Sequence, residues 1–493
     1  MRWLSIGFFV AGVATVGAYA QGPAGGPLGY SIATPRPINP AANTTNPSAR
    51  AAQSQNPYLG SVPSGPATDT TLTLSLSEAI QRGFRYNLGL VENTQGSAEA
   101  RSRRLRALSA MLPNVIARAQ QNFEKLSLKE IGLKLPPIPG FGSLPATTDS
   151  FGFQDARIVA TQSVYNRQLR EEYKARKAEE SASVSGIKDA RDVVVLATGV
   201  AWFQVAASAA RVETARAQVL SARQLDQQTE DRVKAEVAPE IDALRSRVER
   251  QTSEQRLTNA TNDLEKDKLS LARIIGLPVE QQFVVTETAA YVPLTGVTPE
   301  SAKDEALRSR SDLESARSTL KAAEYDVAAR RAQKNPTVGL SAEYGAGGVN
   351  VGNMNHLFSV SASVTVPLYT GGRIQAEVDA ARSELTRKQS ELRDLEGRIA
   401  YDVRTAWLDV QASDSGVAVA QSNRQLAERA LVQAQDRYTN GVTNYLEVVQ
   451  AQEAVAQANE NYIAGLYSFN VSKLSLARAM GTAENRATEF FGR

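Results

Sequence analysis

Hydrophobic and polar residues alternate strictly over residues 358–368. Apolar side chains occupy the even positions from Phe358 to Leu368, and hydroxyl side chains occupy the odd positions from Ser359 to Thr365. Successive residues of a strand face opposite sides, so this strand has an apolar face and a hydroxyl face. Residues 337–344 alternate equally well, and residues 345–357 form a Gly/Asn-rich loop between the two runs. The pattern predicts a hairpin of strands ~9–11 residues long, either crossing a bilayer or lying on a soluble core.

A second, less regular hairpin is expected in the first half of the chain. Residues 115–119 and 156–164 alternate, but Asp155 and Gln162 interrupt the pattern. The loop between these strands, residues 124–150, is long and rich in proline and glycine. Long loops of outer-membrane barrels lie on the outside, so this loop either covers a barrel mouth or decorates the surface.

From residue 70 onward the chain repeats itself. The sequence Lys-Leu-Ser-Leu-Ala-Arg occupies residues 268–273 and again residues 473–478, 205 positions later. The same offset relates Trp202 to Trp407. A constant offset over this distance predicts a duplicated helical unit without net insertion.

Each half predicts a helix, two strands, a very long helix and a return helix. The expected helices are residues 77–111, 166–235 and 240–275 in the first half and 302–334, 373–437 and 445–480 in the second. At 1.5 Å per residue the long helices reach ~100 Å and the return helices ~50 Å. Ile399, Val403, Ala406 and Val410 have heptad spacing and predict lateral packing of helices. The helices therefore predict an elongated bundle with strands at one end, and an ordinary coiled coil is the alternative from the helices alone.

Composition excludes several classes of function. The formal net charge is only +3, so no basic stripe indicates nucleic acid. The chain has no cysteine and one histidine, His356, in the expected loop. Thiol nucleophiles, Cys/His zinc sites and Ser/His/Asp triads are therefore not expected. We predict no catalytic residue, no cofactor and no metal ligand, and so no enzyme.

The N-terminus predicts export. Arg2, the apolar residues 4–16 and the Ala18-Tyr19-Ala20 sequence are typical of a signal peptide over residues 1–20. Residues 21–70, rich in Pro, Gly and Asn, are expected to be a disordered leader. No cysteine follows for a lipid anchor, and no later run of ~18 apolar residues predicts a membrane helix. An exported chain with strand-type membrane signals is expected in a bacterial outer membrane. The structural repeats are expected over residues 71–290 and 291–493, the latter with a C-terminal tail.

Four strands cannot close a barrel. Open sheet edges are not tolerated in lipid, so strands in a membrane require several copies of the chain. A trimer would supply 12 strands and a dimer eight, and both are closed.

The order of several short motifs resembles that of the TolC-type outer-membrane efflux proteins over about residues 71–481. The motifs are Val366-Pro367-Leu368-Tyr369-Thr370-Gly371-Gly372-Arg373, Ala406-Trp407, Arg437-Tyr438-x-x-Gly441, Leu446-Glu447-Val448 and the paired Leu-Ser-Leu-Ala-Arg helix ends. The resemblance implies a mostly α fold with membrane β: a trimer whose 12-stranded β-barrel continues into a long periplasmic α-helical barrel. It also implies an equatorial layer, to which residues 283–285 and the C-terminal tail are assigned. The implied partners are a periplasmic adaptor, an inner-membrane pump and outer-membrane lipid.

The resemblance also implies functional residues at the turns between long and return helices. The tips that contact the adaptor would be Glu236, Val237, Ala238, Gly441, Val442 and Thr443. The first turn lacks the family's glycine, and the family's linking arginine would fall at Thr443.

Three residues near these turns would form a periplasmic aperture. Asp242 and Glu447 would line it, with six carboxylates in a trimer that attract cations. Tyr438 would help to hold the tip shut through a hydrogen bond towards Asp242. The alternative is that the two acidic residues belong to a solvated helix face.

The sequence thus predicts a passive outer-membrane channel of a tripartite efflux pump or type I secretion system. A periplasmic coiled-coil adaptor or structural protein is the alternative. An exported enzyme lacks any nucleophile–base or metal constellation.

Overall fold

The computed structural model describes residues 56–486, apart from 126, 128–146, 148–149, 287–289 and 350. The predicted signal peptide, leader residues 21–55, most of the loop 124–150 and the C-terminal tail from residue 487 lie outside the described residues. Residues Pro57–Arg493 form one compact unit.

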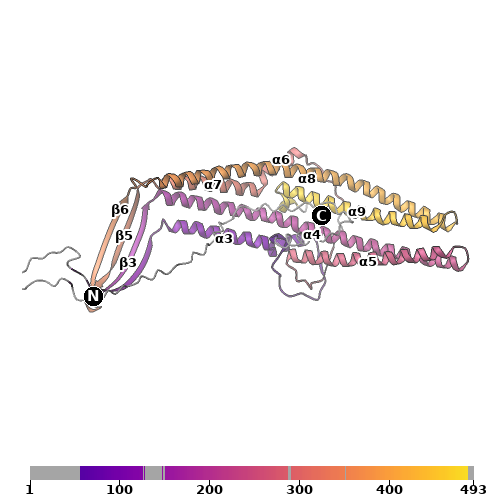
Figure 1. The fold of residues 1–493 in the computed structure, drawn as a ribbon, viewed down its shortest axis with the longest axis horizontal. Helices are drawn as coiled ribbons and strands as arrows, with labels where there is room; N and C mark the ends of the chain where they lie inside the picture. Colours follow the sequence, from indigo (N-terminus) through magenta and orange to yellow (C-terminus); the bar gives the residue numbers. More distant parts are fainter. Residues whose placement is uncertain are drawn as a thin grey trace, which may run out of the picture. The chain divides into compact units, whose positions relative to one another are not determined.

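Four long strands form one antiparallel sheet at one end of the helices (Figure 1). They are β2 (Asn114–Glu124), β3 (Phe151–Tyr165), β5 (Thr337–Gly348) and β6 (Asn355–Thr365), in the order β2-β3-β5-β6. Both predicted hairpins are therefore confirmed, and pairing of β3 with β5 joins the two halves of the chain. β2 and β6 are the two edge strands of the sheet.

The loop expected over residues 345–357 is shorter in the structure. The ladder continues through the pairs Ala346↔His356 and Gly347↔Asn355, so β5 and β6 run into the expected loop. His356 lies in β6, where its ring stacks on Tyr344 with 6.1 Å between ring centroids. The short helix η2 (Val351–Asn353) lies in the connection. Glycine suggested a loop, but the backbone pairing overrides that local preference.

The apolar face of the sheet is highly exposed. Register places Ile158, Tyr344 and Phe358 in one row across three strands, with exposed fractions of 52%, 56% and 75%. Val360 and Val364 on β6 are exposed to 56% and 67%. An apolar face of this extent is not stable in water, so it requires lipid or another protein surface.

The described part of the chain has eight α-helices. They are α2 (Leu76–Tyr86), α3 (Leu88–Ser109), α4 (Arg167–Lys234), α5 (Glu240–Ile275), α6 (Pro299–Ser309), α7 (Ser311–Ala332), α8 (Arg373–Thr439) and α9 (Tyr445–Ala479). Helix α4 packs against α3 and α7 towards the strands and against α5 and α9 towards the other end, and α8 packs against α7 and α9 (Figure 1). The order long helix, turn and return helix occurs in both halves.

The single helices expected over residues 77–111 and 302–334 are wrong, because each is broken in two. Asn87 and Arg310 have extended ψ angles of 128° and 119° at the breaks. The Asn87 side chain accepts a hydrogen bond from Gly89 N at 3.1 Å and donates one to Tyr58 O at 2.7 Å. A buried asparagine that caps the next helix favours the break over a continuous helix.

The expectation of a disordered leader is wrong for residues 56–70, because these residues pack on the helices. Tyr58, in the short helix η1 (Pro57–Leu59), is only 7% exposed, and its hydroxyl accepts a hydrogen bond from Asn93. Thr68 N donates to the Gln281 side chain at 2.8 Å. One aromatic anchor and side-chain hydrogen bonds thus hold a segment whose composition suggested disorder.

The largest core lies near the middle of α4. Trp202, Leu271 and Phe283 are almost fully buried there. Phe283 belongs to β4 (Phe283–Val285), which pairs in parallel with β1 (Leu72–Leu74). Ile399, Val403, Ala406 and Val410 are 0–8% exposed, which confirms the predicted packing seam of α8.

Helix α4 contains a stretch that is long and apolar enough to cross a membrane, and it is the only such helix among the described residues. However, 67% of that stretch is buried within the protein. Its apolar composition is therefore explained by packing in the core.

The end glycine of each return helix packs against a helix break. Gly276 (φ 73°) and Gly481 (φ 69°) have left-handed backbones at the ends of α5 and α9. A Cβ on Gly276 would lie 2.4 Å from Tyr86 Cβ, and one on Gly481 would lie 2.8 Å from Arg310 Cα. The repeated glycine therefore permits both the helix end and the close approach.

We expect Gly481→Ala to destabilise the protein by at least about 1–2 kcal/mol, because alanine is strained in the left-handed conformation. The matched control is Gly397→Ala in α8, where an added Cβ meets nothing within 4 Å. This control should be neutral or stabilising by up to about 1 kcal/mol. Thermal unfolding followed by circular dichroism in detergent measures both. Equal melting temperatures for the two variants would contradict the packing argument.

Candidate functional site

The candidate site is the end of the bundle where the two helical hairpins turn (Figure 1). Helix α4 ends at Lys234 and α5 begins at Glu240, while α8 ends at Thr439 and α9 begins at Tyr445. The predicted tip residues lie in these two turns.

Both turns have the same backbone although only one has a glycine. Gly441 has φ 71°, and Glu236 has φ 57°, the only positive φ of a non-glycine residue in the described chain. Val237 N donates to Arg232 O at 3.0 Å, and Val442 N donates to Arg437 O at 2.9 Å. These bonds are those of a helix end closed by a left-handed residue. The first turn thus reproduces the second at the cost of backbone strain at Glu236.

Tyr438 lies where the two hairpins meet. Its ring contacts Tyr445 edge-on with 5.5 Å between centroids, and the Arg232 guanidinium lies 4.7 Å from its ring centroid. Arg232 Nη1 also donates to the carbonyl oxygens of Tyr438 at 3.3 Å and Thr439 at 3.1 Å. Arg232 therefore connects α4 to the C-terminal end of α8, where a positive charge is favourable.

The hydrogen bond expected from Tyr438 to Asp242 is absent. The Tyr438 hydroxyl oxygen is buried and has no hydrogen-bond partner in the described part of the chain. The physical reason is that the Tyr438 ring is held by the Arg232 guanidinium over its face and by an edge-on contact with Tyr445. Arg232 is therefore the tip residue that the sequence reasoning missed.

Asp242 and Glu447 are equivalent in the repeat but have different surroundings. Asp242 is 4% exposed, and its ion pair with Arg245 is long at 3.6 Å. Glu447 is half-buried, accepts a hydrogen bond from Thr443 Oγ1 and pairs with Arg437 at 3.4 Å. Among the described residues no hydrogen bond or ion pair joins Asp242 to Glu447. Their role in an aperture stays a prediction.

The sequence reasoning also missed a buried polar seam between α4 and α5. Asp226 (7% exposed) accepts hydrogen bonds from Ser246 Oγ at 2.7 Å and from Arg250 Nε at 2.8 Å. The equivalent positions in the second repeat are apolar: Asp226, Thr229, Ser246 and Ser253 correspond to Leu431, Ala434, Ala451 and Ala458. A comparison of the two repeats at these positions would have revealed the seam.

Tyr445 lies against this seam. It is 1% exposed and belongs to a cluster with Leu225, Ala434, Tyr438 and Val448. Burial raises the pKa of the Tyr445 hydroxyl, and the carboxylates of Glu249, Asp226 and Asp242 act in the same direction. The hydroxyl is therefore neutral at physiological pH.

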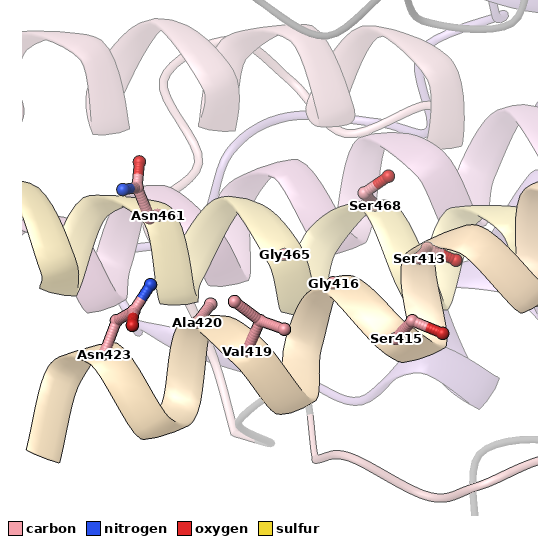
Figure 2. A pocket seen from close by; sticks show the side chains of 9 residues that line it. All are labelled: Ser413, Ser415, Gly416, Val419, Ala420, Asn423, Asn461, Gly465 and Ser468. Atoms are coloured by element: carbon pink, nitrogen blue, oxygen red, sulfur yellow. The ribbon is translucent and has the colours of Figure 1, made fainter.

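A shallow groove lies along α8 and α9 between the tip and the core. Figure 2 shows its small side chains, which come from Ser413, Ser415, Gly416, Val419, Ala420, Asn423, Asn461, Gly465 and Ser468. In the first repeat Gly416, Asn461 and Ser468 correspond to Arg211, Arg256 and Asp263. The two hairpins thus have different side surfaces on similar backbones.

Residues 302–482 match the family model described as outer membrane efflux protein. The chain is a relative of the outer membrane efflux proteins. It is 22% identical to outer membrane efflux protein BepC of Brucella suis biovar 1 over 244 residues, 49% of this chain and 52% of BepC. It is 22% identical to outer membrane protein TolC of Escherichia coli over 389 residues, 73% of this chain and 77% of TolC.

The fold of this efflux-protein relative is that of solved outer-membrane channels. The crystal structure of outer membrane protein VceC from Vibrio cholerae matches with a TM-score of 0.70 at 19% identity, over 82% of this chain and 96% of VceC. At the level of sequence the chain spans about half the length of BepC. The likeness of structure therefore establishes the fold of this chain.

The strain at Glu236 makes a prediction about the tip. Glu236→Gly should stabilise the end of α4 by about 1 kcal/mol, because glycine adopts the left-handed conformation without strain. Glu236→Ala is the matched control: it removes the same side chain but keeps the strain. Gly441→Ala should destabilise the second tip by a similar amount.

Amide hydrogen exchange at the ends of α4 and α8 measures these changes. The strain argument predicts slower exchange in Glu236→Gly alone. Equal protection in the glycine and alanine variants would show that the side chain, rather than the backbone, matters.

Proposed function

We propose that this protein is the outer-membrane exit duct of a tripartite efflux pump or type I secretion system. The observation that carries the proposal is the sheet, whose exposed apolar face lies across from a polar face with rows of hydroxyls. Lipid covers such a face in a membrane barrel, and the polar face then lines a water-filled lumen. A soluble adaptor or structural coiled coil would leave this apolar face in water.

The free edges support an assembly of several chains. β2 and β6 each pair on one side only, and open edges are not tolerated in hydrocarbon. A homotrimer closes the sheet with 12 strands, an even number found in such barrels. The efflux-protein relatives and the channel fold support the trimer over the eight-stranded dimer. The long helices would then form the periplasmic tunnel.

The helical tips are proposed to meet the periplasmic adaptor, and the inner-membrane pump would supply the energy. The tip residues are Glu236, Val237, Ala238, Gly441, Val442 and Thr443, all in the two turns. Val237 and Val442 support this assignment because they are 63% and 68% exposed. Exposed apolar side chains at equivalent places in both turns suit a partner surface.

A pair of arginine substitutions tests the membrane sheet. Val360→Arg puts a charge on the apolar face and should reduce assembled protein in the outer membrane, since the cost is ~2–4 kcal/mol per chain at the bilayer midplane. Ser361→Arg is the matched control, because the next residue on the same strand faces the other side. Fractionation, detergent extraction and cross-linking measure the assembled trimer. Equal loss in both variants, or release of the wild-type protein by osmotic shock alone, would refute the proposal.

The aperture makes a separate prediction. Asp242→Asn combined with Glu447→Gln should weaken cation preference and block by cations in bilayer conductance, because carboxylate rings attract cations. Glu280→Gln, which removes an exposed carboxylate beyond the other end of α5, is the control. Unchanged selectivity in the double variant would remove Asp242 and Glu447 from the aperture.

A further inference from the structure

Positive charge is concentrated at the ends of the helices that join the sheet. The junctions are four: α3 leads into β2, β3 into α4, α7 into β5 and β6 into α8 (Figure 1). The eleven residues of each helix nearest these junctions contain 13 Arg or Lys and 7 Asp or Glu altogether. The eleven residues nearest the tip turns in α4, α5, α8 and α9 contain 7 and 9. The positive surplus is therefore specific to the sheet end of the helices.

Ion pairs within the chain leave this surplus in place. Some cations at the sheet end are neutralised, as where Arg330 and Arg373 share Glu377. Seven others are exposed and form no ion pair within the described residues: Arg101, Arg106, Arg167, Arg170, Lys177, Arg331 and Lys334. The carboxylates of this end that likewise have no ion pair are Glu172 and Glu324. Five positive charges per chain are thus uncompensated.

The last row of the apolar face of the sheet lies beside these cations. Register places Tyr165, Val338 and Val364 in this row, across β3, β5 and β6. Arg167 follows Tyr165 by two residues, and Lys334 precedes Val338 by four. If lipid covers the apolar face, this row marks the border of the hydrocarbon core, and the cations lie just beyond it.

The distances match the headgroup layer of a bilayer. This layer is ~5–8 Å deep on each side of the hydrocarbon. At ~3.3 Å per residue, Arg167 lies ~7 Å beyond Tyr165. Leu368 and Tyr369, between β6 and α8, are 92% and 91% exposed at the same border. Exposed tyrosine is typical of the membrane–water interface.

We propose that a basic collar, made of Arg106, Arg167, Arg170, Arg331 and Lys334, binds anionic phospholipid headgroups. The proposal rests on the proposed function, because only a barrel in the membrane places the collar beside lipid. The helices would lie in the periplasm, so the lipid belongs to the inner leaflet of the outer membrane. A guanidinium donates two parallel hydrogen bonds to a phosphate group, and the positive surplus attracts an anionic bilayer surface.

A single cysteine makes the lipid beside the collar measurable, because the sequence has no cysteine of its own. Tyr369→Cys, labelled with a fluorophore, is reconstituted as the assembled full chain into bilayers that contain brominated phosphatidylglycerol or brominated phosphatidylcholine. Quenching gives the relative association constant of each lipid at the label. We expect about fivefold preference for the anionic lipid. A label at Phe123→Cys, at the opposite end of β2, serves as the reference.

Neutralising the collar should lower this preference to about one at residue 369 and leave the label at residue 123 unaffected. The variant is Arg167→Gln/Arg170→Gln/Arg331→Gln/Lys334→Gln. The matched control removes four exposed cations that form no ion pair within the described chain and lie farther from the sheet: Lys303→Gln/Lys321→Gln/Arg393→Gln/Arg429→Gln. This control should keep the preference. High salt should lower the preference in the otherwise unchanged protein, which tests the collar even if the neutral variant does not assemble.

Three results would overturn the collar. Equal quenching by both lipids, or a preference that neither the neutral variant nor salt changes, would overturn it while the duct remains. A neutral variant that changes only the reversal potential in a KCl gradient would place these cations in the lumen instead. Failure of the unsubstituted protein to enter bilayers would refute the duct, and the collar with it.

Discussion

The hydrogen-bonding demand of the backbone at the edges of a four-stranded sheet is the constraint on which the structure depends. The sheet has an exposed apolar face and two unpaired edges, β2 and β6. In lipid each unpaired backbone group costs several kcal/mol, so isolated chains are unsuited to a bilayer. In the proposed assembly the backbone groups of β2 and β6 pair between chains, and lipid covers the apolar face. The hollow interior then follows from closure of the sheet.

The duplicated helices also hold the two halves of the chain together. Pairing of β3 with β5 joins the two halves, while α4 packs against helices of both halves. Glycines at the ends of the return helices fit into the breaks at Asn87 and Arg310. The two repeats therefore share one framework of helix ends, even where their surface residues differ.

The two repeats differ both in a buried seam between helices and on a side surface of the helical hairpins. The residues of the seam around Asp226 are polar in the first repeat and apolar in the second. The groove around Gly416 is lined by small side chains in the second repeat, whereas several corresponding positions of the first repeat carry charged side chains. Arg232 crosses from one hairpin to the other and lies over Tyr438. The tip is thus asymmetric within each chain, although its two turns have the same backbone.

The sequence by itself determined the period-two strands, the 205-residue repeat, the long helices and their turns, because these depend on local periodicity and on glycine and proline. It also placed Ile399 and Val403 in a packing seam. Only the tertiary structure decided the breaks at Asn87 and Arg310, the ordering of residues 56–70 and the contact of Arg232 with Tyr438. Each depends on partners distant in the chain: Tyr58 for Asn87, Gln281 for Thr68, and α4 for Tyr438. Side-chain contacts of this kind leave no periodic trace, which is why the pattern alone could not reveal them.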